Sequence, residues 1–365
     1  MSAPRPTDRP FHARALLAVG RLIDALSRQF GSEEALFSEF GFLRGYAGFV
    51  SDPDEVEDSP GLRALATTLG LTEAGVDALL ILGLVEDDGR FGVLFEALQN
   101  SPGQHRPSWG LLSQLLGEEV RPALTALLAA GAARVESRDA PRSEWALRVP
   151  LSMWDALGGD PTPALEPGMS YSPPGSLARW EDLTLPPGTR EEVERLDVIA
   201  LRGARRSGRR ALLGARARAA GRGLIELEGA PDRDRWREAG ALATALNADL
   251  ALRLELAAGE AISLERPAAA PAKVGVILGL TGGISGALAE AAETLRVRAP
   301  EPAVRALLWA QHTGSPDVGA ALAPRRVGAG MLVCAARAAH RRSGPTLPWP
   351  RRGARRALPA RRPVP

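Results

Sequence analysis

DVIALRGARRSGRRALLGARARAAGR, residues 197–222, contains the clearest fold signal in this chain. Its apolar run Val198–Leu201 predicts a strand, and Gly203 and Gly208 frame the turn that follows. Residues 209–220 are rich in Ala, Leu and Arg, which favours a helix. A strand, a glycine turn and a helix in this order are typical of a phosphate-binding loop.

The glycine spacing fits the phosphate-loop pattern G-x-x-x-x-G-K-[S/T], but the two residues after the second glycine do not. Arg209 stands at the lysine position and Arg210 at the Ser/Thr position. In the intact motif the lysine reaches the β- and γ-phosphates, and the hydroxyl holds Mg²⁺. Arg209 keeps a positive charge in planar form, whereas Arg210 presents Mg²⁺ with a like charge. The turn therefore predicts a phosphate cradle with weakened or lost hydrolysis.

Strand-like and helical segments alternate after this turn, which predicts an α/β domain with a parallel sheet and helices on its faces. The further expected strands cover residues 224–227, 250–256 and 274–280, and a further helix covers 232–247. Residues 302–342 are expected to be helical, with breaks near Pro316 and near Gly328–Gly330.

The N-terminal part has helical periodicity, in segments expected over residues 11–30, 62–85 with a break at Gly70–Thr72, 89–99, 108–116 and 124–131. Thr72 is the expected N-cap of the helix after that break. Two short strand-like runs follow, Ala132–Glu136 and Trp145–Val149. Helices followed by a β-hairpin predict a winged-helix domain.

Three parts of the chain resemble the AAA-type ATPases, and in particular bacterial members with an N-terminal winged-helix domain and two ATPase modules, the first degenerate. They are Ala78–Gly92 (ALLILGLVEDDGRFG), Trp180–Pro186 (WEDLTLP), and a core made of the glycine turn, Val274–Leu280 and Pro300–Trp309. The resemblance spans roughly residues 11–342. It implies a winged-helix domain over 1–157, a linker over 158–179, a degenerate core over 180–299, a helical lid over 300–342 and a basic tail over 343–365.

The resemblance also implies roles for individual residues. A bound nucleotide would be held by Gly203, Ser207, Gly208, Arg209 and Arg210, and Glu255 is the candidate catalytic acid on the metal side. Thr281 corresponds to a polar sensor and Arg337 to a second sensor in the lid, while Arg296 and Arg298 lie where an arginine finger is expected. ATP is the implied ligand, Mg²⁺ is not expected, and independent ATP hydrolysis is not expected either.

Composition narrows the function further. The net charge is +2, but residues 341–365 contain eight arginines and no acid, so the rest of the chain is net acidic. No apolar run approaches membrane-spanning length, no secretion signal is evident, and a single cysteine, Cys334, excludes an internal disulfide. These features predict a cytoplasmic protein. The four histidines are scattered, so no metal site is expected.

Two alternatives stay open. The first is a winged-helix regulator that binds DNA, supported by Arg134, Arg138, Arg142 and Arg148 around the hairpin; the expected helix 108–116 has no basic residue. Protein partners, or copies of the chain in an AAA-type oligomer, are therefore favoured over nucleic acid. The second is a truncated, non-functional product, because the last 22 residues lack periodicity.

Overall fold

A computed structural model describes residues 10–48, 56–136, 138–160, 162–269, 271 and 273–324. Arg337, the predicted tail 343–365 and the predicted break at Gly328–Gly330 lie outside these residues. The chain divides into two compact units, one ending at Val297 and the other beginning at Arg298. Among the described residues, no helix has both the length and the apolar character needed to span a membrane.

The N-terminal region of the first unit is helical, as its periodicity predicts. Its helices are α1 Pro10–Phe30, α2 Glu33–Glu39, α3 Arg44–Ala47, α4 Pro60–Leu69, α5 Glu73–Asp87, α6 Arg90–Gln99, α7 Trp109–Leu116, α8 Val120–Ala130 and α9 Leu151–Leu157. The Thr72 hydroxyl accepts a hydrogen bond from the Gly75 amide at 3.3 Å, which confirms the predicted N-cap of α5. Strands β1 Arg134–Val135 and β2 Leu147–Arg148 then pair as a short antiparallel ribbon.

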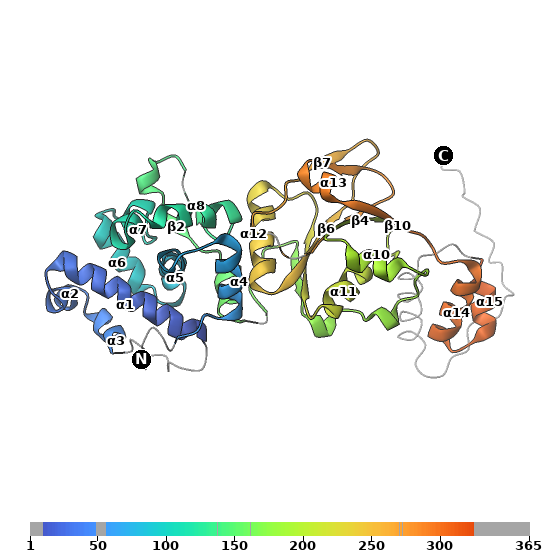
Figure 1. Ribbon diagram of the computed structural model, residues 1–365, viewed down its shortest axis with the longest axis horizontal. Coiled ribbons are helices and arrows are strands. Elements are labelled where there is room, and N and C mark those ends of the chain that lie inside the picture. The colour runs from blue at the N-terminus through green and yellow to red at the C-terminus, as the bar shows by residue number, and fades with distance from the viewer. Residues whose placement is uncertain are drawn as a thin grey trace, which may run out of the picture. The chain divides into compact units, whose positions relative to one another are not determined.

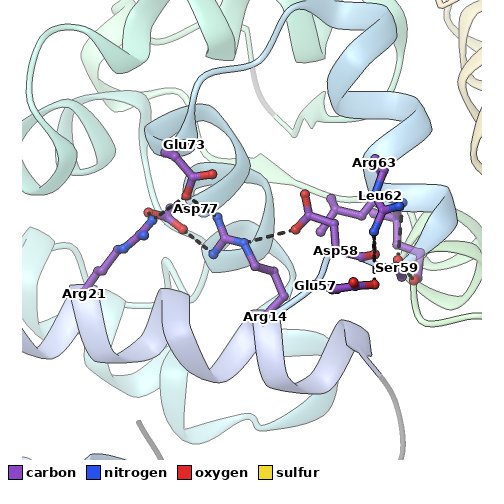
Figure 2. Close-up of polar contacts among 10 residues, drawn as sticks. Arg14, Arg21, Glu57, Asp58, Ser59, Leu62, Arg63, Glu73 and Asp77 are labelled. Carbon is purple, nitrogen blue, oxygen red and sulfur yellow. Dashed lines mark hydrogen bonds and ion pairs between the residues drawn. The ribbon is translucent and has the colours of Figure 1, made fainter. Parts of the chain in front are cut away.

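An ion-pair network joins α1 to α5 inside this region (Figure 2). The Arg14 guanidinium is only 3% exposed and contacts three carboxylates, those of Asp77 at 2.8 Å, Glu73 at 3.1 Å and Asp58 at 3.2 Å. Arg21, two turns further along α1, also pairs with Asp77, at 2.6 Å. The buried charge of Arg14 is thus fully compensated, which is the condition under which a protein interior accepts a charge.

A six-stranded sheet follows, in the order β10-β4-β8-β6-β5-β3. All neighbours are parallel except β3 and β5, which are antiparallel. The strands are β3 Met169–Ser172, β4 Val198–Gly203, β5 Gly223–Glu228, β6 Ala248–Leu254, β8 Val274–Leu278 and β10 Glu293–Val297. This confirms the predicted α/β class and the mostly parallel sheet.

Two strands of this sheet were not expected from the sequence. Residues 158–179, predicted to be a linker, contain β3, and residues 293–297 form β10. Both strands lie at the edges of the sheet and have, among the described strands, one neighbour each. Edge strands need no continuous apolar run, which explains why the polar sequences MSYS and ETLRV escaped the hydrophobic pattern.

The sheet separates two layers of apolar side chains. Val198 and Ala200 of β4 belong to the core cluster shared with α12 (Arg233–Ala245), whereas Ile199 and Leu201 pack with α11 (Arg209–Ala219). This alternation is the two-residue period of a strand buried on both faces. Figure 1 shows α12 between the helical region and the sheet, with α10 (Thr189–Arg195) and α11 on the other face.

The helical region and the sheet share one core. Apolar residues of α4, α8 and α9 belong to the same buried cluster as Trp236 and Leu242 of α12. A polar contact adds to it: Glu238 of α12 is fully buried, accepts a hydrogen bond from Ser152 of α9 at 2.8 Å, and pairs with Arg134 of β1. Burial raises the pKa of Glu238, and the charge of Arg134 opposes this shift.

The remaining elements are small. Strands β7 Ala261–Ser263 and β9 Gly283–Ser285 pair in parallel, and α13 covers Ala287–Ala291. The second unit contains α14 Pro302–Thr313 and α15 Pro316–Leu322, with the predicted break at Pro316. Arg305 of α14 contacts the end of α15, since its Nε donates a hydrogen bond to the Ala323 carbonyl at 2.8 Å.

Candidate functional site

The glycine turn lies at the carboxyl end of β4, which is an interior strand of the sheet. After β4 the chain continues to β5, which lies on the β8 side of β4. After β8 its next strand in this sheet is β10, which lies on the opposite side of β4. The direction of the connections therefore reverses between β4 and β8. In open α/β sheets the crevice at such a reversal, at the carboxyl ends of the strands, is where ligands bind.

The turn itself has the backbone of a tight loop before a helix. Gly208 is the N-cap of α11 in the left-handed region, with φ 97°, and no side chain caps the first turn of the helix. Arg206 is also left-handed, with φ 59°, and the Ser207 amide donates to the Ala204 carbonyl at 3.2 Å. The first amides of α11 are thus left for an external acceptor at the positive end of the helix dipole.

Ser207 is enclosed by the turn. Its residue is 6% exposed, and among the described residues its Oγ has no hydrogen-bond partner. This oxygen lies 3.0 Å from where a Cβ on Gly203 would be, so the Ser207 side chain reaches across the turn to the end of β4. The same Cβ would lie 2.7 Å from the Val297 carbonyl oxygen, so β10 can approach β4 this closely only at a glycine.

Arg209 is buried at the start of α11. Its residue is 5% exposed, and its guanidinium donates to the carbonyls of Leu278, at the end of β8, and of Ala204, the latter at 3.0 Å. Burial lowers the pKa of Arg209, while the charge of Glu255 opposes the shift. The side chain at the lysine position therefore crosses the carboxyl ends of β4 and β8 and forms no ion pair with any described carboxylate.

The Arg210 side chain contacts β5 and β3. Its Nε donates to the Glu226 carboxylate at 2.7 Å, and it also donates to the Ser172 hydroxyl at 2.9 Å. Glu226 lies in β5, is almost fully buried, and has a second ion pair with Arg253 of β6. The residue at the Ser/Thr position is therefore one of two counterions of a buried acid. An acid inside the otherwise apolar run 224–227 is the sequence signal that could have indicated this pair.

Glu255 lies closer to the turn than its sequence position suggests. The strand predicted over residues 250–256 ends at Leu254, so Glu255 is the first residue beyond the carboxyl end of β6. Its Oε1 lies 3.5 Å from Nε of Arg205, a turn residue that the sequence did not single out. Its other oxygen lies 3.7 Å from where a Cβ on Gly279 would be, just beyond β8.

The other predicted site residues are dispersed. The Thr281 hydroxyl donates to the Leu256 carbonyl at 2.9 Å, so Thr281 lies near the same edge of the sheet. Arg296 is exposed in β10, and Arg298 begins the second unit. The described part of the chain contains no group of three His, Cys, Asp or Glu side chains able to hold a metal ion. The residues at this edge do not fit Mg²⁺, because Arg210 replaces the hydroxyl and Glu255 is paired.

The four arginines near the β1–β2 hairpin all have internal partners. Arg134 pairs with Glu166 and Glu238, Arg138 with Asp234, and Arg148 with Glu136, while Arg142 lies 5.2 Å from the ring centroid of Trp109. A cavity of about 430 Å³ between α8, the hairpin and α12 is lined by three of these arginines and by two acids. The basic side chains expected to favour DNA are thus largely neutralised.

No family model matches the chain, and no curated protein matches it either.

Proposed function

We propose that this chain is a nucleotide-binding module of the AAA type that lacks ATP hydrolysis of its own and acts as a structural or regulatory subunit. The observation that supports this most directly is the position of the Gly203–Gly208 turn. It joins an interior parallel strand to the start of a helix, at the reversal point of the sheet. Backbone amides in such a turn can bind phosphate oxygens without any side chain.

Loss of hydrolysis follows from the two arginines. Phosphoryl transfer needs a cation to neutralise the γ-phosphate and side chains that hold Mg²⁺. Arg209 donates to two backbone carbonyls, and Arg210 compensates Glu226. With no lysine ammonium to reach the γ-phosphate and no hydroxyl to hold Mg²⁺, binding is expected without turnover, and the partners are other proteins or copies of the same chain.

Titration with a fluorescent ATP analogue tests the location of binding. Gly208→Asp places a carboxylate in the turn, where no atom of the described residues blocks it but the φ of 97° strains any side chain. The matched control is Gly221→Asp at the far end of α11, because Gly221 has φ 68° and equally open surroundings. We expect Gly208→Asp to abolish binding and Gly221→Asp to preserve it, with no phosphate release above the blank in any sample.

Binding that survives Gly208→Asp, or brisk turnover by the purified chain, would contradict the proposal. The DNA-binding alternative has a separate test. Nucleotide-dependent assembly in sedimentation supports the AAA-type module, whereas a salt-sensitive shift of DNA in a gel supports the regulator.

A further inference from the structure

We infer that the turn binds the phosphate chain of a nucleotide or free polyphosphate without a divalent metal, and that the Glu255 carboxylate competes with that anion for Arg205. This site rests on the proposed function, since it is the same Gly203–Gly208 turn. The chemical class of the ligand is a metal-free polyanion, and Glu255 is the residue that regulates its access.

The first observation is the excess of positive charge at the turn. Arg205 and Arg206 are exposed, and Arg206 has no ion pair among the described residues. Arg209 adds a buried guanidinium that contacts only carbonyl oxygens. The uncapped first amides of α11 contribute the positive end of a helix dipole beside these side chains.

The second observation is independent and concerns Ser207. A hydroxyl that is buried without a partner loses its hydrogen bond to water and gains nothing in return. Its Oγ lies across the turn, beside Gly203 at the end of β4. A phosphate oxygen in the turn would accept the hydrogen bond that the protein leaves unmade.

Glu255 is an anion that the protein itself supplies to this site. One carboxylate oxygen pairs with Arg205 at 3.5 Å, and the other lies 3.7 Å from where a Cβ on Gly279, just beyond β8, would be. The pair is well exposed, with Arg205 81% and Glu255 46% accessible, so it opens at little cost. An incoming polyanion must displace this carboxylate or tolerate its repulsion.

The same contacts predict whether Mg²⁺ strengthens or weakens the binding of the polyphosphate. Mg²⁺ prefers carboxylate, hydroxyl and water oxygens. Here Glu255 is paired with a guanidinium, and Arg210 occupies the hydroxyl position. Mg²⁺ therefore gains no ligand from the protein while it removes two negative charges from the polyphosphate, so it should weaken binding.

Calorimetric titration of the full chain with ATP and with inorganic tripolyphosphate, in EDTA and then in excess MgCl₂, tests this. We expect Glu255→Gln to tighten both anions about two- to fivefold in EDTA, the range of an exposed ion pair. Glu194→Gln is the matched control, since Glu194 also pairs with an exposed arginine, Arg190, but lies in α10 before β4. It should change nothing, whereas Ser207→Ala should weaken binding.

The outcomes separate the two proposals. If Gly208→Asp abolishes binding but Glu255→Gln leaves it unchanged or weaker, or if Mg²⁺ strengthens it, the competition by Glu255 is refuted while the nucleotide-binding module stands. If neither the wild type nor Glu255→Gln binds either anion, the proposed function itself is refuted. Tighter binding by Glu255→Gln, weakened by Mg²⁺, supports both.

Discussion

Two buried arginines, Arg14 in the helical region and Arg209 at the sheet, are almost equally hidden from solvent, with 3% and 5% exposure. Their partners differ. Arg14 contacts three carboxylates, whereas Arg209 contacts two carbonyl oxygens and, among the described residues, no carboxylate. Removing one member of a compensated buried pair leaves the other charge buried and unpaired, whereas a buried cation held by carbonyl oxygens alone can still attract an anionic ligand.

The same comparison separates Arg209 from its neighbour Arg210. Both were expected to hold a nucleotide, since both follow the second glycine of the turn. Arg210 instead resembles Arg14, because it compensates the buried Glu226. Within the described ranges, Arg209 has no carboxylate counterion, so Arg210 has a structural partner while Arg209 keeps its charge for the proposed ligand.

The largest expected effect is on Arg14. Arg14→Met should lower the free energy of unfolding by about 3 kcal/mol, because it leaves Asp77 buried with reduced compensation. Urea denaturation measures this. The control is Arg28→Met on the exposed side of the same helix, expected to change stability by less than about 0.5 kcal/mol. If Arg14→Met and Arg28→Met changed the free energy of unfolding equally, the three carboxylate contacts of Arg14 would contribute no more to stability than an exposed arginine does.

Arg210→Thr, which restores the usual residue type of the motif, comes next. It should cost about 1–2 kcal/mol, because Glu226 keeps Arg253 but loses its other counterion. The double variant Arg210→Thr/Glu226→Gln should be more stable than the sum of the single effects predicts, with a coupling of about 1 kcal/mol in a double-mutant cycle. Strict additivity would show that Arg210 and Glu226 do not stabilise each other.

Arg209→Met should have the smallest effect on stability, below about 1 kcal/mol, because losing two hydrogen bonds is offset by removing a buried charge. The same variant should weaken ATP binding about tenfold, the share of a charge-assisted contact. Paired urea and ATP titrations of Arg209→Met and Arg14→Met check both effects. If Arg209→Met lost as much stability as Arg14→Met, Arg209 would have the same structural role as Arg14.

The sequence predicted the interior of the fold well. The helices α1, α4 and α5, with the cap at Thr72, and the central strands β4, β5, β6 and β8 all follow from local periodicity and turn chemistry. These elements are buried on at least one face, so their patterns are strong. The edge strands β3 and β10 were missed because they have one neighbour each and a polar composition.

The side-chain partners were much less predictable. The turn was located correctly at the end of an interior strand, but the pairing of Arg210 with Glu226 depends on the arrangement of β3, α11 and β5. Glu255 was placed inside a strand because Leu256 prolongs the apolar run, while the ladder with β8 ends at Leu254. The acid inside the apolar run 224–227 signals that Glu226 needs a cation, but tertiary register decides which arginines provide it.

The shared burial around Glu238 also affects how the chain can be divided. Helix α12 connects β5 to β6 and also packs against α4, α8 and α9. The helical region and the sheet region therefore each use the other to bury apolar side chains. Recombinant fragments cut between residues 158 and 179 would each expose apolar side chains to water. The cut would also separate Glu238 from Ser152 and Arg134. The junction of Val297 and Arg298 is the better place to trim the chain for crystallisation.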